Sequence, residues 1–211
     1  MTGFSDIGAV VIGRNEGARL KNCLQALQGR VGHMIYVDSG STDDSQEVAR
    51  KAGARVLELD NALPFTAARA RNAGLAFLRA NEPALEFVQF VDGDCEIQPG
   101  WIETAHTFLI TNPVAAVACG RRRERFPDAS VYNGMIDREW DTPIGQTRSC
   151  GGDALMRIAA LKDVDGFNPA LIAGEEPELC VRLRKAGWAI WRLDAEMTLH
   201  DAQMTRFGQW W

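Results

Sequence analysis

Two aspartates, one residue apart, follow an apolar and β-prone run in the middle of the chain. Residues 87–91 are predicted to form a buried strand, and Asp92-Gly93-Asp94 comes directly after it. Charged side chains at such a place need partners, so we expect them to face a crevice. Two carboxylates at this spacing can hold a hard divalent cation, and the glycine lets another ligand approach closely. The alternative is an ordinary Asp-Gly turn.

Polar residues also follow two earlier predicted strands, at residues 7–13 and 34–37. They are Gly13-Arg14-Asn15-Glu16 and Asp38-Ser39-Gly40-Ser41. Ser41 fits a helix N-cap with an acid three residues later, whereas capping does not explain Asp38. In open α/β sheets, ligands bind outside the carboxyl ends of the strands. Three polar clusters at one edge therefore predict a nucleotide crevice, in which Asp38 accepts from a base or a ribose.

Two further clusters carry charge. Arg71 and Asn72 lie among alanines in a predicted helix, which suits a helix that approaches a diphosphate; a solvent-facing helix is the alternative. Glu175 and Glu176 precede Pro177, the predicted first helical position. Acids there favour the helix dipole, but glutamate is a poor N-cap, so one of them is a candidate general base. His200 is a candidate metal ligand or a packing residue.

The predicted elements that must position these residues alternate between strand and helix up to residue 120. Strands are expected at 7–13, 34–37, 55–59, 87–91 and 114–119, and helices at 20–27, from Ser41 onward, 67–78 and 99–109. This alternation predicts an α/β fold with a mostly parallel sheet. Residues 121–125 (Arg-Arg-Arg-Glu-Arg) are expected to form a solvated loop. Helices at 132–140 and 177–186, with strands at 154–156 and 188–193, follow.

Composition limits the class of protein. The 211 residues suit one domain, and the net charge of −5 argues against a nucleic-acid binder. Five scattered cysteines without a C-x-x-C pair fit reduced thiols. Neither a signal peptide nor a membrane-spanning run is seen, so a cytoplasmic protein, peripheral at the inner membrane if attached at all, is expected. The terminal Trp210 and Trp211 indicate either C-terminal truncation or contact with a partner or membrane.

Five segments, taken in order, resemble the motifs of glycosyltransferase family 2, the inverting enzymes of the GT-A fold. They are Val10-Val11-Ile12-Gly13-Arg14-Asn15-Glu16, Val37-Asp38-Ser39-Gly40-Ser41-Thr42-Asp43, Ala70-Arg71-Asn72-Ala73-Gly74, Asp92-Gly93-Asp94 and Gly174-Glu175-Glu176-Pro177-Glu178-Leu179. The resemblance covers essentially the whole chain. The family's V-D-D-G-S-x-D segment has its second aspartate replaced by Ser39, and Glu176 stands where the G-E-D-x-[DE]-L box usually has aspartate.

The resemblance implies a role for each matching residue. Asp94 and His200 would bind a cation, Mg²⁺ or Mn²⁺, and Asp92 would face the ribose or a metal-bound water. Glu176 would be the catalytic base, with Glu175 or Glu178 as alternatives. The implied donor-binding residues are Gly13, Arg14, Asn15, Glu16, Asp38, Ser39, Arg71, Asn72, Asp92, Gly93 and Asp153.

The implied activity is metal-dependent, inverting transfer of a sugar from a nucleotide-diphosphate donor to a carbohydrate or lipid-linked acceptor, as in polysaccharide biosynthesis. Residues 1–120 would bind the nucleotide and residues 121–211 the acceptor, within one domain. Membrane contact would lie beyond the C-terminus. A sugar nucleotidyltransferase is the rival enzyme, although Gly13-Arg14-Asn15-Glu16 is short for its glycine-rich loop. An inactive nucleotide-sugar-binding relative is the non-enzymatic alternative.

Overall fold

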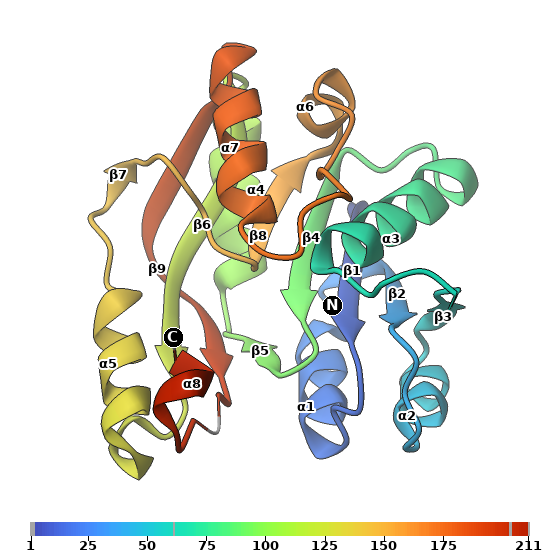
Figure 1. Ribbon diagram of the computed structural model, residues 1–211. Helices are drawn as coiled ribbons and strands as arrows, with labels where there is room; N and C mark the ends of the chain where they lie inside the picture. The colour runs from blue at the N-terminus through green and yellow to red at the C-terminus, as the bar shows by residue number, and fades with distance from the viewer. Residues whose placement is uncertain (1–2, 61, 203, 211) are drawn as a thin grey trace.

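The computed structural model describes residues 3–60, 62–202 and 204–210. Within these ranges the chain forms a nine-stranded sheet in the order β3-β2-β1-β4-β8-β6-β9-β5, with β7 paired to β9. Helices flank the sheet, and the earlier and later parts of the chain occupy opposite sides of Figure 1. The α/β fold with a mostly parallel central sheet is confirmed.

The first part of the chain builds the parallel side of the sheet with its first four strands and adds a short fifth strand at the opposite edge. Its strands are β1 (Phe4–Gly13), β2 (Val31–Asp38), β3 (Arg55–Glu58), β4 (Phe87–Asp92) and β5 (Cys95–Ile97), and its helices are α1 (Ala18–Leu27), α2 (Ser45–Lys51), α3 (Ala67–Asn81) and α4 (Trp101–Thr111). β1 pairs in parallel with both β2 and β4, and β2 pairs in parallel with β3. The apolar runs of β1 and β4 are buried, as strands covered on both faces require.

The second part extends the same sheet. Its strands are β6 (Ala115–Glu124), β7 (Gly145–Gln146), β8 (Ala154–Arg157) and β9 (Ala189–His200), and its helices are η1 (Pro127–Ala129), α5 (Val131–Glu139), α6 (Ile158–Asp163), α7 (Glu175–Lys185) and α8 (Phe207–Trp210). β8 lies between β4 and β6 and runs antiparallel to both, whereas β6 and β9 are parallel. Both parts therefore share one sheet.

Close packing fixes the position of α3, the helix that carries Arg71. A Cβ atom at Gly74 would lie 2.4 Å from Val10 Cγ1 on β1. Only a residue without a side chain allows this approach of helix to strand. The helix is capped by Thr66, whose hydroxyl accepts from the Arg69 N–H at 3.1 Å.

Most predicted elements are confirmed, with three corrections. The expectation that Ser41 caps α2 is wrong, because α2 begins at Ser45 after Asp44, and Ser41 instead donates to Asp38. Residues 121–125 are not a solvated loop, since β6 extends through Glu124, which is buried. α7 begins at Glu175 rather than Pro177.

Two predictions concern the end of the chain and membrane contact. Trp211 lies outside the described residues, so the expectation for this terminus stays a prediction. In the described part of the chain, no helix combines the length and apolar character needed to cross a bilayer.

Candidate functional site

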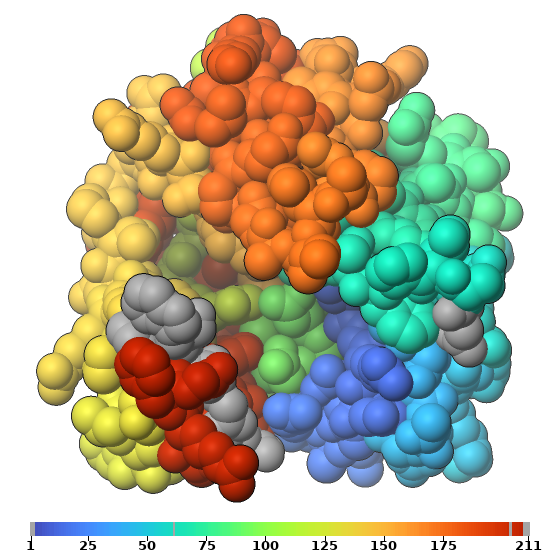
Figure 2. All heavy atoms as spheres, in the orientation of Figure 1, coloured from blue at the N-terminus to red at the C-terminus, as the bar shows by residue number. Residues whose placement is uncertain are grey.

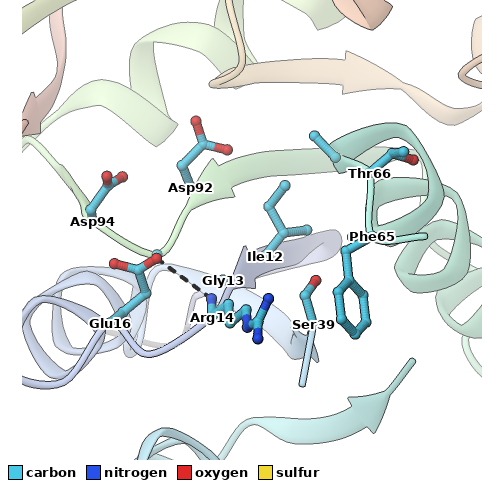
Figure 3. A pocket seen from close by; sticks show the side chains of 12 residues that line it. Ile12, Gly13, Arg14, Glu16, Ser39, Phe65, Thr66, Asp92 and Asp94 are labelled. Atoms are coloured by element: carbon cyan, nitrogen blue, oxygen red, sulfur yellow. Dashed lines mark hydrogen bonds between the residues drawn. The ribbon is translucent and has the colours of Figure 1, made fainter. Parts of the chain in front are cut away.

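The three polar clusters predicted from the sequence meet at one edge of the sheet. The register places Gly13 beside Asp38 and Ile12 beside Asp92, so the carboxyl ends of β2, β1 and β4 lie side by side. A cavity of about 330 Å³ opens there, lined by Ile12, Gly13, Arg14, Glu16, Ser39, Phe65, Thr66, Ala67, Ala70, Asp92, Gly93 and Asp94. Asp92, Asp94 and Glu16 lie on one side of it, and Ser39 and Phe65 on the other (Figure 3).

Strand register also brings His200 to Asp94. β5 and β9 pair antiparallel with Cys95 opposite His200, while β6 pairs Glu124 with the same histidine. His200 Nε2 lies 3.2 Å from Asp94 Oδ2, and His200 Nδ1 lies 3.5 Å from Glu124 Oε2. The predicted partnership of Asp94 and His200 is thus present in the geometry, although 106 positions separate them in the chain.

Ionisation in this cluster is coupled. Burial alone would lower the pKa of His200, but the neighbouring carboxylates of Asp94 and Glu124 outweigh it and raise the pKa to about 9. Burial would raise the pKa of Asp94, yet His200, Arg122 and Arg19 together hold it below its usual range. The pKa of Glu16 is raised, first by burial and then by the neighbouring Asp94.

The residues present fit a divalent cation. Asp94 offers a carboxylate and His200 an imidazole, within 4.8 Å of each other, and Asp94 lines the cavity. His200 Nδ1 is buried and makes no hydrogen bond with the described residues. An oxygen and a nitrogen donor suit Mn²⁺ better than Mg²⁺, which prefers oxygen ligands and water. The nearby Cys95 thiol is a poor ligand for such hard cations.

Arginine holds Asp92 at the edge of the first cavity, and its predicted contact with a ribose or a metal-bound water stays a prediction. Asp92 Oδ1 lies 2.7 Å from Arg71 Nη2, and Arg71 Nη1 lies 2.5 Å from Glu175 Oε1. Arg71 is buried, and the carboxylates raise its pKa against the effect of burial. Arg71 therefore links the end of β4 to the first turn of α7, and its predicted contact with a diphosphate stays a prediction.

A second arginine, Arg122 on β6, binds the other oxygen of Asp92. Its Nη2 lies 3.2 Å from Asp92 Oδ2 and 2.5 Å from Asp153 Oδ2, and its guanidinium lies 5.2 Å from the centre of the Trp140 ring. Asp153 is fully buried and also accepts from Thr198 and from the Asp92 N–H. Asp153 therefore holds both Asp92 and Arg122 in position.

Glu176 lies in a second cavity, of about 220 Å³. The other lining residues are Cys119, Gly120, Arg122, Glu139, Trp140, Thr142, Ser149, Cys150, Gly151, Asp153 and Met197. Glu176 Oε1 accepts from the Cys150 N–H at 2.5 Å and from the Cys180 thiol at 2.9 Å. Glu175 instead pairs with Arg71, and Glu178 pairs with Arg182 at 2.7 Å. Glu176 therefore lines this cavity, whereas Glu175 and Glu178 line neither of the two cavities.

The two cavities meet at one ion-pair network, Asp92–Arg122–Asp153. Asp92 lines the first cavity, and Arg122 and Asp153 line the second. Gly152 allows the loop before β8 to pass this network, since a Cβ there would lie 2.9 Å from Asp92 Oδ2. Figure 2 shows a hollow between the two sides of this face.

Besides Arg71, three residues predicted to bind the donor make internal contacts instead of lining either cavity. Asp38 is buried and accepts hydrogen bonds from Tyr36, Gly40, Ser41 and Gln46. Asn15 accepts from the Thr42 N–H at 2.7 Å. The Asn72 side-chain amide donates to the Phe167 carbonyl and accepts from the Phe167 N–H. These contacts hold the loops around the first cavity in place.

Four residues of the site are not predicted by the sequence patterns: Arg122, Glu124, Trp140 and Cys180. The arginine and Glu124 fall in the expected loop, and Trp140 is predicted only as the end of a helix. An available signal is the continuation of an apolar strand directly into charged residues at 121–124. Such a strand places alternate side chains on opposite faces.

Solved structures with the same architecture define the class. Glucosyl-3-phosphoglycerate synthase from Mycobacterium tuberculosis, in complex with Mn²⁺, UDP and glucosyl-3-phosphoglycerate, superposes with a TM-score of 0.68 at 21% identity, over 96% of this chain and 73% of that one. Mannosyltransferase PcManGT from Pyrobaculum calidifontis, in complex with GDP-Man and Mn²⁺, gives 0.73 at 15% identity, over 98% and 60%. The fold is that of the GT-A glycosyltransferases.

Sequence similarity gives the family. Residues 9–160 match the model of glycosyl transferase family 2, and the chain belongs to this family. It is 29% identical to the succinoglycan biosynthesis protein ExoA of Rhizobium meliloti, over 83% of this chain and 55% of that protein. It is 27% identical to the pre-mycofactocin glycosyltransferase of Mycobacterium tuberculosis, over 97% and 44%. The chain thus spans about half the length of these relatives.

Proposed function

We propose that the protein is a divalent-cation-dependent, inverting glycosyltransferase that moves a sugar from a nucleotide-diphosphate donor to an acceptor hydroxyl. The observation that carries the proposal is the junction of two cavities at Asp92–Arg122–Asp153, with Asp94 and His200 on one side and Glu176 on the other. Structural neighbours in complex with Mn²⁺ and UDP or GDP-Man support it.

The first cavity is the proposed donor site. Its Ser39 and Phe65 side would receive the nucleoside, and its acidic side the cation-bound diphosphate. The cation would be held by Asp94 and His200, and when bound it neutralises charge on the leaving diphosphate. Arg71 and Arg122 keep the carboxylate of Asp92 in one orientation beside it. Mn²⁺ is the proposed ion because both structural neighbours are in complex with it.

The second cavity is the proposed acceptor site. Two donors hold Glu176 Oε1, and no hydrogen bond to Oε2 is found among the described residues. Oε2 takes the proton of the acceptor hydroxyl, whose oxygen attacks the anomeric carbon opposite the diphosphate. The new C–O bond forms as the bond to the diphosphate breaks, and the configuration inverts.

The two cavities also support a division of labour along the chain. Residues 12–94 line the first, and residues 119–197 line the second. We therefore assign donor binding to residues 1–120 and acceptor binding to residues 121–211. The acceptor is proposed to be a carbohydrate or a lipid-linked carbohydrate, in polysaccharide biosynthesis, which the name of the relative ExoA supports.

The test is Glu176→Gln, compared with Glu178→Gln on the same helix. The first variant removes the base but keeps its size, so we expect transfer to fall by about 10²–10⁴-fold while the Kd for the donor changes little. Glu178 forms an ion pair with Arg182 outside the cavities, and its variant should retain activity. Calorimetry measures binding, and product anomers are identified by NMR.

Three results would contradict the proposal. Full transfer activity in Glu176→Gln would exclude this residue as the base. Release of pyrophosphate from a nucleoside triphosphate by the wild type would favour a nucleotidyltransferase instead. Donor binding without transfer to any of a panel of acceptors would indicate a binding protein.

A further inference from the structure

Two thiols and one carboxylate converge beneath the acceptor cavity. Cys150 lies in the loop before β8, whereas Glu176 and Cys180 are one turn apart on α7. The two Sγ atoms are 3.7 Å apart, and Cys180 Sγ lies 2.9 Å from Glu176 Oε1. All three side chains are buried, and one ligand atom from each lies within 4.8 Å of the others. In the proposed transfer the Cys180 thiol only helps to hold Glu176, and the Cys150 thiol has no role.

We propose that Cys150, Glu176 and Cys180 form a site for a thiophilic cation of the Zn²⁺ type. A tetrahedral ion with metal–sulfur bonds of about 2.3 Å has its two sulfurs about 3.8 Å apart. The observed Sγ–Sγ distance of 3.7 Å matches that edge without movement of the backbone. It also exceeds the length of a disulfide bond by more than about 1.5 Å, so a disulfide would require the side chains to move.

The charges and the route of entry are consistent with such a site. Binding replaces the two thiol protons with the cation, which leaves the three ligands and Zn²⁺ with a net charge of −1. Cys150 and Glu176 line the second cavity, which gives the ion a path in and leaves room for a fourth ligand, such as water. This soft pair of ligands differs in kind from the carboxylate and imidazole of Asp94 and His200.

Occupation of the site has a consequence for catalysis, which rests on the proposed function. A cation bound at Glu176 Oε1, the oxygen beside the thiols, would lower the basicity of the carboxylate and so weaken Oε2 as the proton acceptor. Zn²⁺ would then inhibit transfer without displacing Mn²⁺ from Asp94 and His200. Binding at the thiols and inhibition of transfer are separate measurements, so failure of one can be told from failure of the other.

The experiment uses Co²⁺ as a spectroscopic substitute for Zn²⁺ in the reduced, intact protein. We expect a thiolate-to-Co²⁺ charge-transfer band in the near ultraviolet, which stoichiometric Zn²⁺ abolishes. Cys150→Ser and Cys180→Ser should each weaken Zn²⁺ binding at least about tenfold, since even loss of an outer-shell partner costs this much. Cys23→Ser, a buried thiol on α1, and Asp94→Ala, at the other cation site, should retain the band.

Certain results would overturn the site. They are the absence of the band in the wild type, or its persistence in both Cys150→Ser and Cys180→Ser. If either variant does not fold, the test is alkylation of the thiols in the wild-type protein, with the modified residues located by peptide mass mapping. Zn²⁺ should slow the alkylation of Cys150 and Cys180, and equal alkylation rates with and without Zn²⁺ would refute the proposal. A band with undiminished transfer would support the metal site and contradict Glu176 as the base.

Discussion

Arg122 has the largest predicted effect on stability among the residues of the site. It is the cation that Asp92 and the fully buried Asp153 share. Arg122→Met would leave Asp153 as an uncompensated buried charge, so we expect the free energy of unfolding to fall by about 3–5 kcal/mol. Urea denaturation at neutral pH measures the loss.

The double variant Arg122→Met/Asp153→Asn separates charge from packing. Removing both charges should recover part of the loss, because an unpaired buried charge costs more than the absence of the pair. Arg184→Met serves as the control, since that side chain is exposed on α7 and should change stability by less than about 0.5 kcal/mol. Additive effects of Arg122→Met and Asp153→Asn would contradict the interpretation.

The residues of the site differ in how well the sequence predicts them. Residue type and spacing indicate Asp94, whereas Glu176 is distinguished from its neighbouring glutamates only by the resemblance to the family motif; both line cavities. Asp38 is expected to reach a ligand, but its oxygens are occupied by neighbouring donors, which depend on how the following loop folds. Arg122 escapes prediction because its partners come from β4 and the loop before β8, which no local pattern reveals.

At the scale of elements, long strands and helices with clear periodicity are predictable and short ones are not. β5 has three residues and β7 has two, too few for a pattern to be recognised. Yet β5 is the strand that places Cys95 opposite His200 and so brings Asp94 to that histidine. The proposed metal site therefore depends on the register between β5 and β9, which only the assembled sheet specifies.

The contact between α5 and β6 predicts a pH dependence of stability. Burial would raise the pKa of Asp137, but hydrogen bonds from Arg123 and the Glu124 N–H outweigh it and lower the pKa. The pKa of Asp137 is therefore lower in the folded state than in the unfolded state, where it is near 3.8, and the charged carboxylate stabilises the folded state at pH values above 3.8. This stabilisation is lost as the pH falls through the folded-state pKa.

We therefore expect Asp137→Asn to lower the free energy of unfolding by about 1–3 kcal/mol at pH 7, and by less as the pH approaches 3. Urea denaturation at a series of pH values measures this convergence. Asp128→Asn, an exposed residue of η1, should change stability by less than about 0.5 kcal/mol throughout. A loss for Asp137→Asn that is constant with pH would show that the carboxylate's charge is not the cause.

Over the whole molecule, one sheet carries both proposed binding halves. β8, from the second half, separates β4 from β6, and β5 pairs with β9 at the far edge. The alternation of strand and helix predicts the parallel side of this sheet, but the insertion of an antiparallel strand has no local signature. Because neither half completes its own sheet, ligand binding in one cavity stabilises the molecule as a unit.

That coupling predicts the response of the melting temperature to ligands. A nucleoside diphosphate and Mn²⁺, each bound to the folded state alone, stabilise it by about 2.7 kcal/mol at one hundred times Kd. For a chain of this size, this corresponds to a rise in Tm of about 5–10 °C. A screen of UDP, GDP, ADP and TDP, each with and without Mn²⁺, identifies the nucleobase of the donor by the largest shift in Tm.

Asp94→Ala should abolish the part of the Tm shift that needs Mn²⁺, whereas Asp128→Asn should retain it. An equal Mn²⁺-dependent shift in both variants would place the cation elsewhere than Asp94 and His200.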